Sequence, residues 1–272
     1  MAVLTPNLLG SSRSPKPRSR STSLGRTRQI PRLEDFDILR PISKGAFGKV
    51  YLAKKRTTGD TFAAKVVDIN DMRRKNLMNQ VLAERNAMAL ARSDFVVRLF
   101  YTFRSAEHFV LVMEYMPGGD LSSLLGVYGC FEVPMARFYV AQLSSALEYL
   151  HQHKVIHRDI KPDNILIDAK GHIRLTDFGL SQQLDRAATL RRKPSGQRPP
   201  TVPGSPDYVA RELVLGLGGT DDAVDWWAAG VVLFELLAGY TPFMADSPEE
   251  IFANIVQMSM FHLFFFASKT HS

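Results

Sequence analysis

The sequence predicts an α+β protein with two lobes, a small β-rich lobe followed by a larger, mainly helical one. Short segments rich in β-branched and aromatic residues occupy residues 35–115. After "MPGGD" the apolar residues recur instead at the three- and four-residue spacing of helices. This change of period divides the ordered part of the chain into residues 33–115 and 116–256.

Turn-forming residues such as "TTGD" separate the predicted strands from one another. The strand segments are "DFDILRPIS", "KVYLAKK", "TFAAKVVDI", "VVRLFYTF" and "HFVLVMEY". One helix, over residues 71–91, is expected to interrupt them, because its apolar residues form an irregular face.

The second lobe contains three clear helix signals. Apolar residues follow Pro134 at helical spacing, and proline suits the first turn of a helix. The segment "AVDWWAAGVVLFELLAG" is apolar on every face, which predicts a helix buried on all sides. In "SPEEIFANIV", Ser247 is the expected N-cap, with acidic residues at the positive end of the helix dipole.

The net charge of +7 comes from the N-terminus, since residues 1–32 contain seven Lys and Arg and no acid. This Ser-, Pro- and Arg-rich stretch is poor in apolar residues, which predicts a disordered basic tail. The alternatives are an organelle transit peptide, a phosphorylatable tail that contacts an acidic partner, and a nucleic-acid-binding tail. Because the other 240 residues are balanced in charge, nucleic-acid binding is not the expected function.

The composition is typical of a globular protein in a reducing compartment. Cys130 is the single cysteine, which excludes a disulfide framework and predicts a cytoplasmic or nuclear location. No run approaches the roughly 18 apolar residues that span a bilayer. We expect no membrane span and a monomer.

The segment "SKGAFGKV" joins the first two predicted strands, and its glycines allow backbone amides to approach a phosphate closely. A glycine turn in a hairpin explains the same pattern. Lys65 follows in "FAAKVV", where its apolar neighbours predict burial and therefore demand a charged partner. Glu84, on the next predicted helix, can supply that charge.

Oxygen-bearing side chains gather in "VIHRDIKPDNILI" and "HIRLTDFGLS". Asp159, Asn164 and Asp177 come from these two segments, with Lys161 beside them. Such a set suits Mg²⁺ together with bound phosphates. Each motif alone is equally compatible with a charged loop between strands, but their joint order favours phosphate chemistry.

In this order the motifs resemble those of the protein kinase family. "HRDIKPDN" is similar to the serine/threonine branch. "DFDILRPISKGAFGKVYLA", "HFVLVMEYMPGGDLSSLL" and "GHIRLTDFGLS" resemble the AGC group, in particular the microtubule-associated Ser/Thr kinases and Greatwall. The resemblance covers residues 36–256 and implies a bilobal protein kinase-like fold that transfers the γ-phosphate of ATP, with Mg²⁺, to protein Ser or Thr hydroxyls.

The resemblance also implies roles for individual residues. Asp159 would accept the hydroxyl proton, Lys161 would steady the transferred group, and Asn164 and Asp177 would hold Mg²⁺. The remaining nucleotide-binding residues that it implies are Ile42, Ser43, Lys44, Gly45, Ala46, Phe47, Gly48, Val50, Ala63, Lys65, Glu84, Met113, Glu114, Met116, Asp120 and Leu166.

Regulation is implied by the segment 177–212. Thr201 occupies the usual activating phosphorylation site, where an upstream kinase would add charge that pairs with Arg158, and Ser205 would face the substrate. Three acids, Asp120, Asp163 and Glu235, fall where related kinases bind basic residues upstream of the acceptor.

The sequence departs from the family pattern at three places. Ser43 replaces the first loop glycine, and Arg211 replaces the proline before Glu212. Residues 257–272 are an apolar tail that does not match the final helices of the large lobe, so we expect a C-lobe without those helices and without a partner for Glu212. A nucleotide-binding interaction module, or a truncated competitor of a longer kinase, is therefore the alternative to an active enzyme.

Overall fold

The computed structural model describes residues 31–45, 48–90, 93–183, 204–217 and 221–259. All of them belong to one compact unit, residues 31–272, while residues 1–30 form a separate unit. Most of the basic tail, Ala46 and Phe47 of the glycine loop, Thr201 and the apolar segment 260–272 lie outside the described residues.

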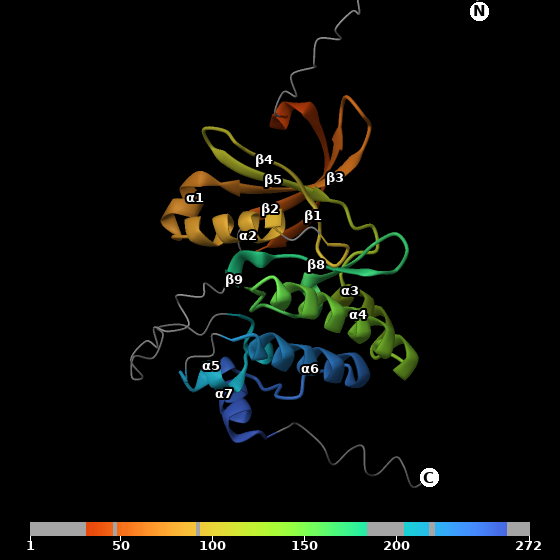
Figure 1. The fold of residues 1–272 in the computed structure, drawn as a ribbon, viewed down its shortest axis with the longest axis vertical. Coiled ribbons are helices and arrows are strands. Elements are labelled where there is room, and N and C mark those ends of the chain that lie inside the picture. The colour runs from red at the N-terminus through yellow and green to blue at the C-terminus, as the bar shows by residue number, and fades with distance from the viewer. Residues whose placement is uncertain (1–30, 46–47, 91–92, 184–203, 218–220, 260–272) are drawn as a thin grey trace, which may run out of the picture. The chain divides into compact units, whose positions relative to one another are not determined.

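A five-stranded antiparallel sheet forms the first part of the larger unit (Figure 1). In chain order its strands are β1 (Phe36–Gly45), β2 (Gly48–Lys55), β3 (Thr61–Asp68), β4 (Leu99–Arg104) and β5 (His108–Glu114). They are arranged β1-β2-β3-β5-β4, so β3 lies at the centre. The five strands predicted from the sequence are confirmed, and β3 is buried on both faces because its apolar residues do not alternate with polar ones.

The single helix expected over residues 71–91 is wrong, because two helices occupy this region. The structure has α1 (Ile69–Arg74) and α2 (Met78–Leu90), separated at Lys75. Asn76 adopts a left-handed conformation with φ of 54°, which a continuous helix cannot contain. The side chain of Asp68 caps α1 by accepting hydrogen bonds from two backbone N–H groups.

The second part is mainly helical, as predicted. Its helices are α3 (Leu121–Tyr128), α4 (Val133–Gln152), α5 (Arg211–Val214), α6 (Ala223–Ala238) and α7 (Pro248–Gln257). Short strand pairs join β6 (Val155–Ile156) to β9 (Gln182–Gln183), and β7 (Ile165–Ile167) to β8 (Ile173–Leu175). Ser247 caps α7 through its hydroxyl, which confirms the predicted start of that helix.

The expectation that α6 is buried on all sides is wrong. One face packs against α4, with which α6 runs side by side (Figure 1). The side chains of Trp226 and Leu233, seven residues apart on another face, remain 42% and 37% exposed. The sequence pattern alone overestimates burial here because it carries no information on which neighbours cover each face.

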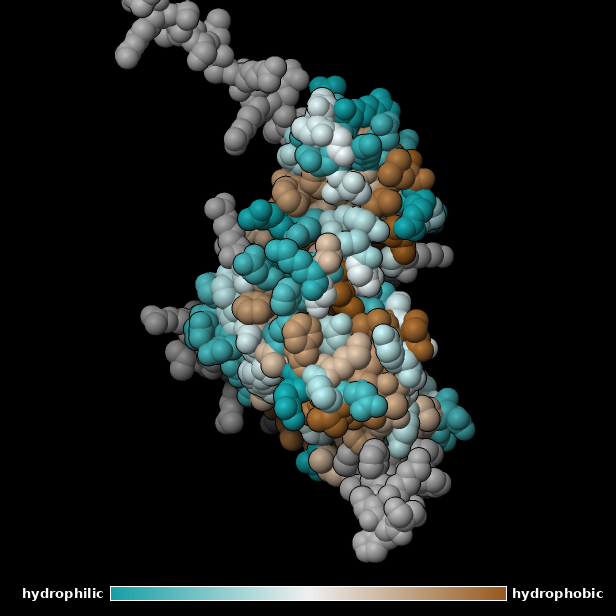
Figure 2. Space-filling model, turned by 90° about the vertical axis from the view of Figure 1, so that its right-hand side faces the viewer, coloured by the Kyte–Doolittle hydropathy of each residue, from teal (hydrophilic) through white to brown (hydrophobic). Residues whose placement is uncertain are grey.

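One hydrophobic cluster connects the sheet with the helical part. It runs from Val67 on β3 through Phe178 to Leu236 on α6. Apolar residues also lie among polar ones on the surface that Figure 2 shows. In the described part of the chain we find no helix with the length and apolar character needed to cross a bilayer.

Candidate functional site

Lys65 is buried at the centre of the sheet and forms an ion pair with Glu84 of α2. Its ammonium lies 2.7 Å from one carboxylate oxygen and 2.8 Å from the other. Burial lowers the pKa of Lys65, but the charges of Glu84 and Asp177 outweigh this effect and raise the pKa above its ordinary value. The expected pairing is therefore present, and Lys65 stays charged.

Asp177 brings a second carboxylate to Lys65, with 3.5 Å between the ammonium nitrogen and Oδ1. The backbone of Asp177 is left-handed, with φ of 60°, which turns its side chain out of the preceding strand, β8. The next residue, Phe178, is fully buried and packs against the ring of His157 at 4.6 Å. An aspartate with a strained backbone next to a fully buried aromatic residue is typical of functional sites.

The catalytic-loop candidates lie in direct contact with one another. The amide nitrogen of Asn164 donates to the carbonyl of Asp159 at 2.7 Å and to its carboxylate at 2.9 Å. The ammonium of Lys161 lies 3.4 Å from that carboxylate and donates to the hydroxyl of Ser205 at 2.7 Å. Asp159, Lys161, Asn164 and Ser205 therefore form one connected group.

The donor set fits a divalent metal that is shared with phosphates. Because Asn164 uses its amide nitrogen toward Asp159, its amide oxygen is left without a hydrogen bond to any described residue. Oδ1 of Asp177 is buried and has no hydrogen-bond partner among them. One amide and one carboxylate oxygen are too few to enclose Mg²⁺ alone, and such sites are usually completed by nucleotide phosphates and water.

Asp225 of α6 anchors this loop, and the sequence analysis did not identify it. The carboxylate is fully buried and accepts hydrogen bonds from the backbone N–H groups of His157, at 2.8 Å, and Arg158, at 2.7 Å. It also contacts Nε2 of His151 at 2.8 Å. The sequence signal that could have identified Asp225 is its place as a single acid in the apolar segment "AVDWWAAG", because a buried charge requires partners.

Arg158 is held beside the loop in a left-handed conformation, with φ of 68°. Its guanidinium donates to the side chain of Gln182 at 2.9 Å, while Nε is buried without a partner among the described residues. Burial lowers the pKa of Arg158, and the charge of Asp225 opposes that shift. Its expected partner, Thr201, lies outside the described residues.

The expected nucleotide-binding residues beyond the glycine loop and Glu84 come from four strands and the segment after β5. Ala63 pairs with Met113 across β3 and β5, and Val50 pairs with Lys65. Leu166 on β7 makes a bridge to Asp120, whose carboxylate caps α3 by accepting from the N–H of Ser123 at 2.6 Å. Met116 is buried, and Glu114 is half-buried.

The glycine loop is described only in part. Ile42 and Ser43 lie on β1, where Lys44 and Gly45 pair with Lys49 and Gly48 of β2. A Cβ atom at Gly48 would lie 2.5 Å from the carbonyl oxygen of Val66, so this position requires glycine. The close approach of the Gly48 backbone to the carbonyl of Val66 therefore constrains the hairpin that joins β1 and β2.

Acidic side chains cluster beside the group around Asp159. The hydroxyl of Tyr208 donates to Glu235 at 2.7 Å, and the hydroxyl of Thr241 donates to Asp207 at 2.7 Å. Burial raises the pKa of Glu235, the Tyr208 hydrogen bond opposes that shift, and the charges of Asp163 and Asp207 raise it further. The three neighbouring carboxylates therefore make this a favourable place for a positively charged group to bind.

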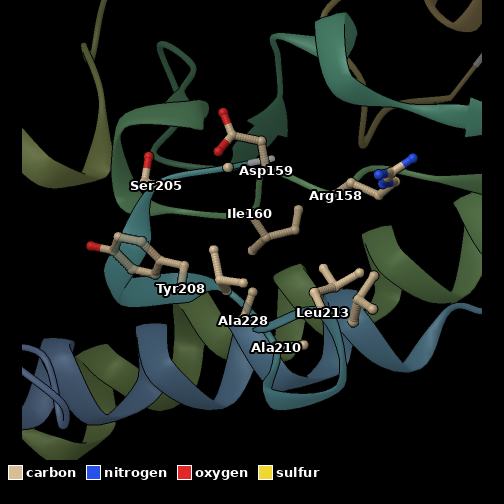
Figure 3. Close-up of a pocket in the computed structure, with 11 residues that line it drawn as sticks. Arg158, Asp159, Ile160, Ser205, Tyr208, Ala210, Leu213 and Ala228 are labelled. Carbon is tan, nitrogen blue, oxygen red and sulfur yellow. The ribbon is translucent and has the colours of Figure 1, made fainter. Parts of the chain in front are cut away.

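A pocket lies beneath the catalytic loop, between the segment 204–213 and α6 (Figure 3). In Figure 3, Ile160 projects into it toward Ala228, while the carboxylate of Asp159 points away from it. The lining is mixed, because Arg158, Asp159, Ser205 and Tyr208 contribute to it together with apolar residues such as Ile160 and Leu213.

Comparisons with known proteins agree with this geometry. Residues 36–271 match the family model "Protein kinase domain". The chain is 48% identical over 248 residues to the probable serine/threonine protein kinase IRE of Arabidopsis thaliana, covering 82% of this chain and 21% of that protein. It is 53% identical over 165 residues to the serine/threonine-protein kinase greatwall of Xenopus laevis, covering 61% of this chain and 18% of that protein.

The chain therefore belongs to the protein kinase domain family, and its relatives are named as serine/threonine kinases. The resemblance to this family, including greatwall, is confirmed, and so is the bilobal α+β fold. The chain spans about a fifth of the length of the curated relatives that it matches.

Proposed function

We propose that this chain transfers the γ-phosphoryl group of ATP to serine or threonine hydroxyls of protein substrates. The observation that carries the proposal is the buried contact of Lys65 with Glu84, at 2.7 Å, beside Asp177, at 3.5 Å. A cation held in this way is already in position, so binding phosphate oxygens requires no further ordering of its side chain.

The other residues divide the work of transfer. Asp159 accepts the proton of the attacking hydroxyl, and Lys161 stabilises charge on the transferred group. The hydrogen bond from Lys161 to Ser205, at 2.7 Å, supports a position for the substrate hydroxyl beside Ser205. Asn164 and Asp177 hold Mg²⁺, which neutralises phosphate charge when it is bound.

Transfer of labelled phosphate from ATP by the purified full chain tests this function. We expect Mg²⁺-dependent labelling of a Ser/Thr protein substrate, and loss of the signal in Asp159→Asn and Asp177→Asn. Nucleotide binding without transfer would favour the alternative, an interaction module or a competitor of a longer kinase. No binding of ATP by the folded chain with saturating Mg²⁺ would overturn the assignment.

Substrates with basic residues upstream of the acceptor fit the acidic cluster. The negative charges of Asp163 and Asp207 raise the pKa of Glu235, and an arginine placed among the three carboxylates would relieve this repulsion. Asp120 contributes less, because its carboxylate already caps α3. Peptides that differ only by arginine or citrulline at these positions test the preference.

Regulation and location complete the proposal. An upstream kinase phosphorylates Thr201, and the added charge pairs with Arg158, whose guanidinium is only partly satisfied. The kinase acts as a monomer in the cytoplasm or nucleus. Activity of Thr201→Ala and Thr201→Glu after treatment with an activating kinase, and imaging of the tagged chain in cells, check these points.

A further inference from the structure

Arg174 on β8 reaches the first residues of the segment that connects the sheet to the helical part. Its Nη1 lies 3.6 Å from a carboxylate oxygen of Glu114, the last residue of β5. The same nitrogen lies 3.7 Å from the carboxylate of Asp94. The side chains of Arg174 and Glu114 are only 18% and 30% exposed, so solvent screens this pair less than the pair with the fully exposed Asp94.

A third carboxylate, that of Asp168, also senses Arg174. Burial pushes the pKa of Asp168 up, but hydrogen bonds from the backbone N–H groups of His172 and Lys170, and then the charge of Arg174, lower it below its usual value. One guanidinium therefore compensates three acids. Its removal would leave the partly buried carboxylate of Glu114 without its balancing charge, whereas the carboxylate of Asp94 is fully exposed to solvent.

Glu114 connects Arg174 to the segment that is expected to bind the nucleotide. The backbone N–H of Glu114 donates to the carbonyl of Arg98 at 2.9 Å, and the N–H of Arg98 lies 3.4 Å from the Glu114 carboxylate. Glu114 is thus tied to the preceding segment through both its backbone and its side chain. Glu114 and Met116 are among the nucleotide-binding residues that the family resemblance implies.

The backbone of Arg174 is tied to the other side of the same site. In the β7–β8 pair, Arg174 lies directly opposite Leu166, the residue proposed to lie against the adenine. The neighbouring Leu175 accepts a hydrogen bond from the N–H of Val97 at 3.0 Å and donates to the carbonyl of Phe95 at 2.8 Å. Through its backbone and its side chain, Arg174 connects the two walls between which the base would lie.

We propose that Arg174 is a positioning residue for nucleotide binding, because it fixes Glu114 relative to Leu166. This inference rests on the proposed function. Arg174 Nε is buried without a partner in the described part of the chain, which is an unfavourable feature that an aliphatic side chain would avoid. Retaining a guanidinium here is explained by its charge acting on the three acids.

The test measures KM for ATP, kcat, and the affinity for a fluorescent ATP analogue in Arg174→Met and Arg174→Lys. We expect Arg174→Met to raise KM and weaken analogue binding by about threefold to tenfold, with kcat changed less than about twofold. Arg174→Lys should recover most of the loss, because it restores the charge. The matched control is Arg137→Met, which changes an exposed arginine on α4.

A double variant separates positioning from general stability. If Arg174 acts through Glu114, then Glu114→Gln weakens binding to a similar degree, and adding Arg174→Met costs little more. Equal affinity of the parent and Arg174→Met for the analogue overturns the positioning role and leaves the proposed function intact. A folded parent chain that binds no nucleotide overturns both. Loss of kcat in proportion to lost thermal stability, without a change in KM, also overturns it.

Discussion

Arg211 donates a hydrogen bond of 3.0 Å from its Nε to the backbone carbonyl of Val256. Arg211 is the first residue of α5, and Val256 lies in the last turn of α7. A cation at this position satisfies one of the free carbonyls of the helix end and interacts favourably with its dipole. Arg211, which replaces the proline of the family pattern, thus links the end of the segment 177–212 to α7.

We therefore expect Arg211→Ala to destabilise the fold by about 0.5–1 kcal/mol, at the low end for a hydrogen bond because the contact is exposed. Urea unfolding followed by circular dichroism measures this difference. Arg137→Ala, which removes an exposed arginine from the middle of α4, is the control. Equal unfolding midpoints for the two variants would show that the contact contributes nothing.

The end of α7 is capped by Met258 in a left-handed conformation, with φ of 55°. Glycine adopts this conformation without the steric cost that a side chain adds, so Met258→Gly should stabilise the protein by about 0.5–1 kcal/mol. Gly239→Ala is the opposite case, because the new Cβ would lie 2.5 Å from the carbonyl oxygen of Gly129. Thermal unfolding should therefore move the two variants in opposite directions.

Breaking the buried pair of Lys65 and Glu84 should affect both stability and activity. Glu84→Ala removes the carboxylate closest to a buried ammonium, and we expect a loss of about 3–5 kcal/mol. Glu84→Gln should cost less, because its amide oxygen can still accept a hydrogen bond. Phosphate transfer should fall at least about tenfold in both.

The pH dependence of this pair follows from the raised pKa of Lys65. A group whose pKa is raised by folding contributes stability that is complete below its unfolded pKa, here an ordinary value of 10.5, and lost as pH rises through the folded value. The stability difference between the parent and Glu84→Gln should therefore be constant at neutral and mildly alkaline pH. A difference that declined between about pH 7 and 9 would contradict a charged Lys65.

Asp225→Asn should disturb the catalytic loop without touching a substrate. The carboxylate holds the N–H groups of His157 and Arg158 with its two oxygens, and an amide offers only one acceptor. One of these N–H groups then faces an NH₂ donor in a fully buried site. We expect a loss of about 2–4 kcal/mol in unfolding free energy.

Asp225→Asn should lower kcat by a larger factor than it changes KM for ATP. Asp225 holds the N–H groups of His157 and Arg158, and Asp159 is the next residue in the chain, so a loosened loop misplaces Asp159. Steady-state kinetics at a temperature where the variant is folded provide the measurement. Asp222→Asn, which alters an exposed acid one turn earlier, is the matched control. An unchanged kcat in Asp225→Asn would separate the anchor from catalysis.

Binding of an arginine-containing peptide should improve as pH rises through the raised pKa of Glu235. Burial and the charges of Asp163 and Asp207 raise this pKa above the ordinary value of 4.5, so the carboxylate loses its proton over a higher pH range than an ordinary glutamate does. KM for the arginine peptide should fall with rising pH in that range, and the citrulline peptide should show a smaller change. Glu235→Gln should remove the difference between the two peptides.

Local pattern was sufficient for most of the elements. The five strands follow from short β-branched and aromatic runs between turns, and α4 and α7 follow from apolar spacing with Pro134 and Ser247 at their starts. These signals lie within a few residues of one another, so no information on distant contacts is needed. Asp159, Lys161 and Asn164 could be named for the same reason, since they lie in one contiguous motif, whereas Ser205 was named only through the family resemblance.

Two of the three errors lie where distant contacts decide. The break between α1 and α2 is the local one: the N–H of Leu77 donates to the carbonyl of Met72, five residues earlier, and the apolar face alone did not reveal this turn. Asp225 was overlooked because its partners are 67 and 68 residues earlier in the chain. Burial of α6 was overestimated because composition does not say which face a neighbour covers.

The sequence by itself determined the order of strands and helices and the residue types that chemistry requires, because both are written in local spacing. The sequence also indicated Glu84 as a partner for Lys65, but only the tertiary structure decided that Asp177 joins this pair, and that Arg174 lies against Glu114 while its backbone pairs with Leu166. Such contacts join elements far apart in the chain, and their geometry is fixed by packing of the core between them.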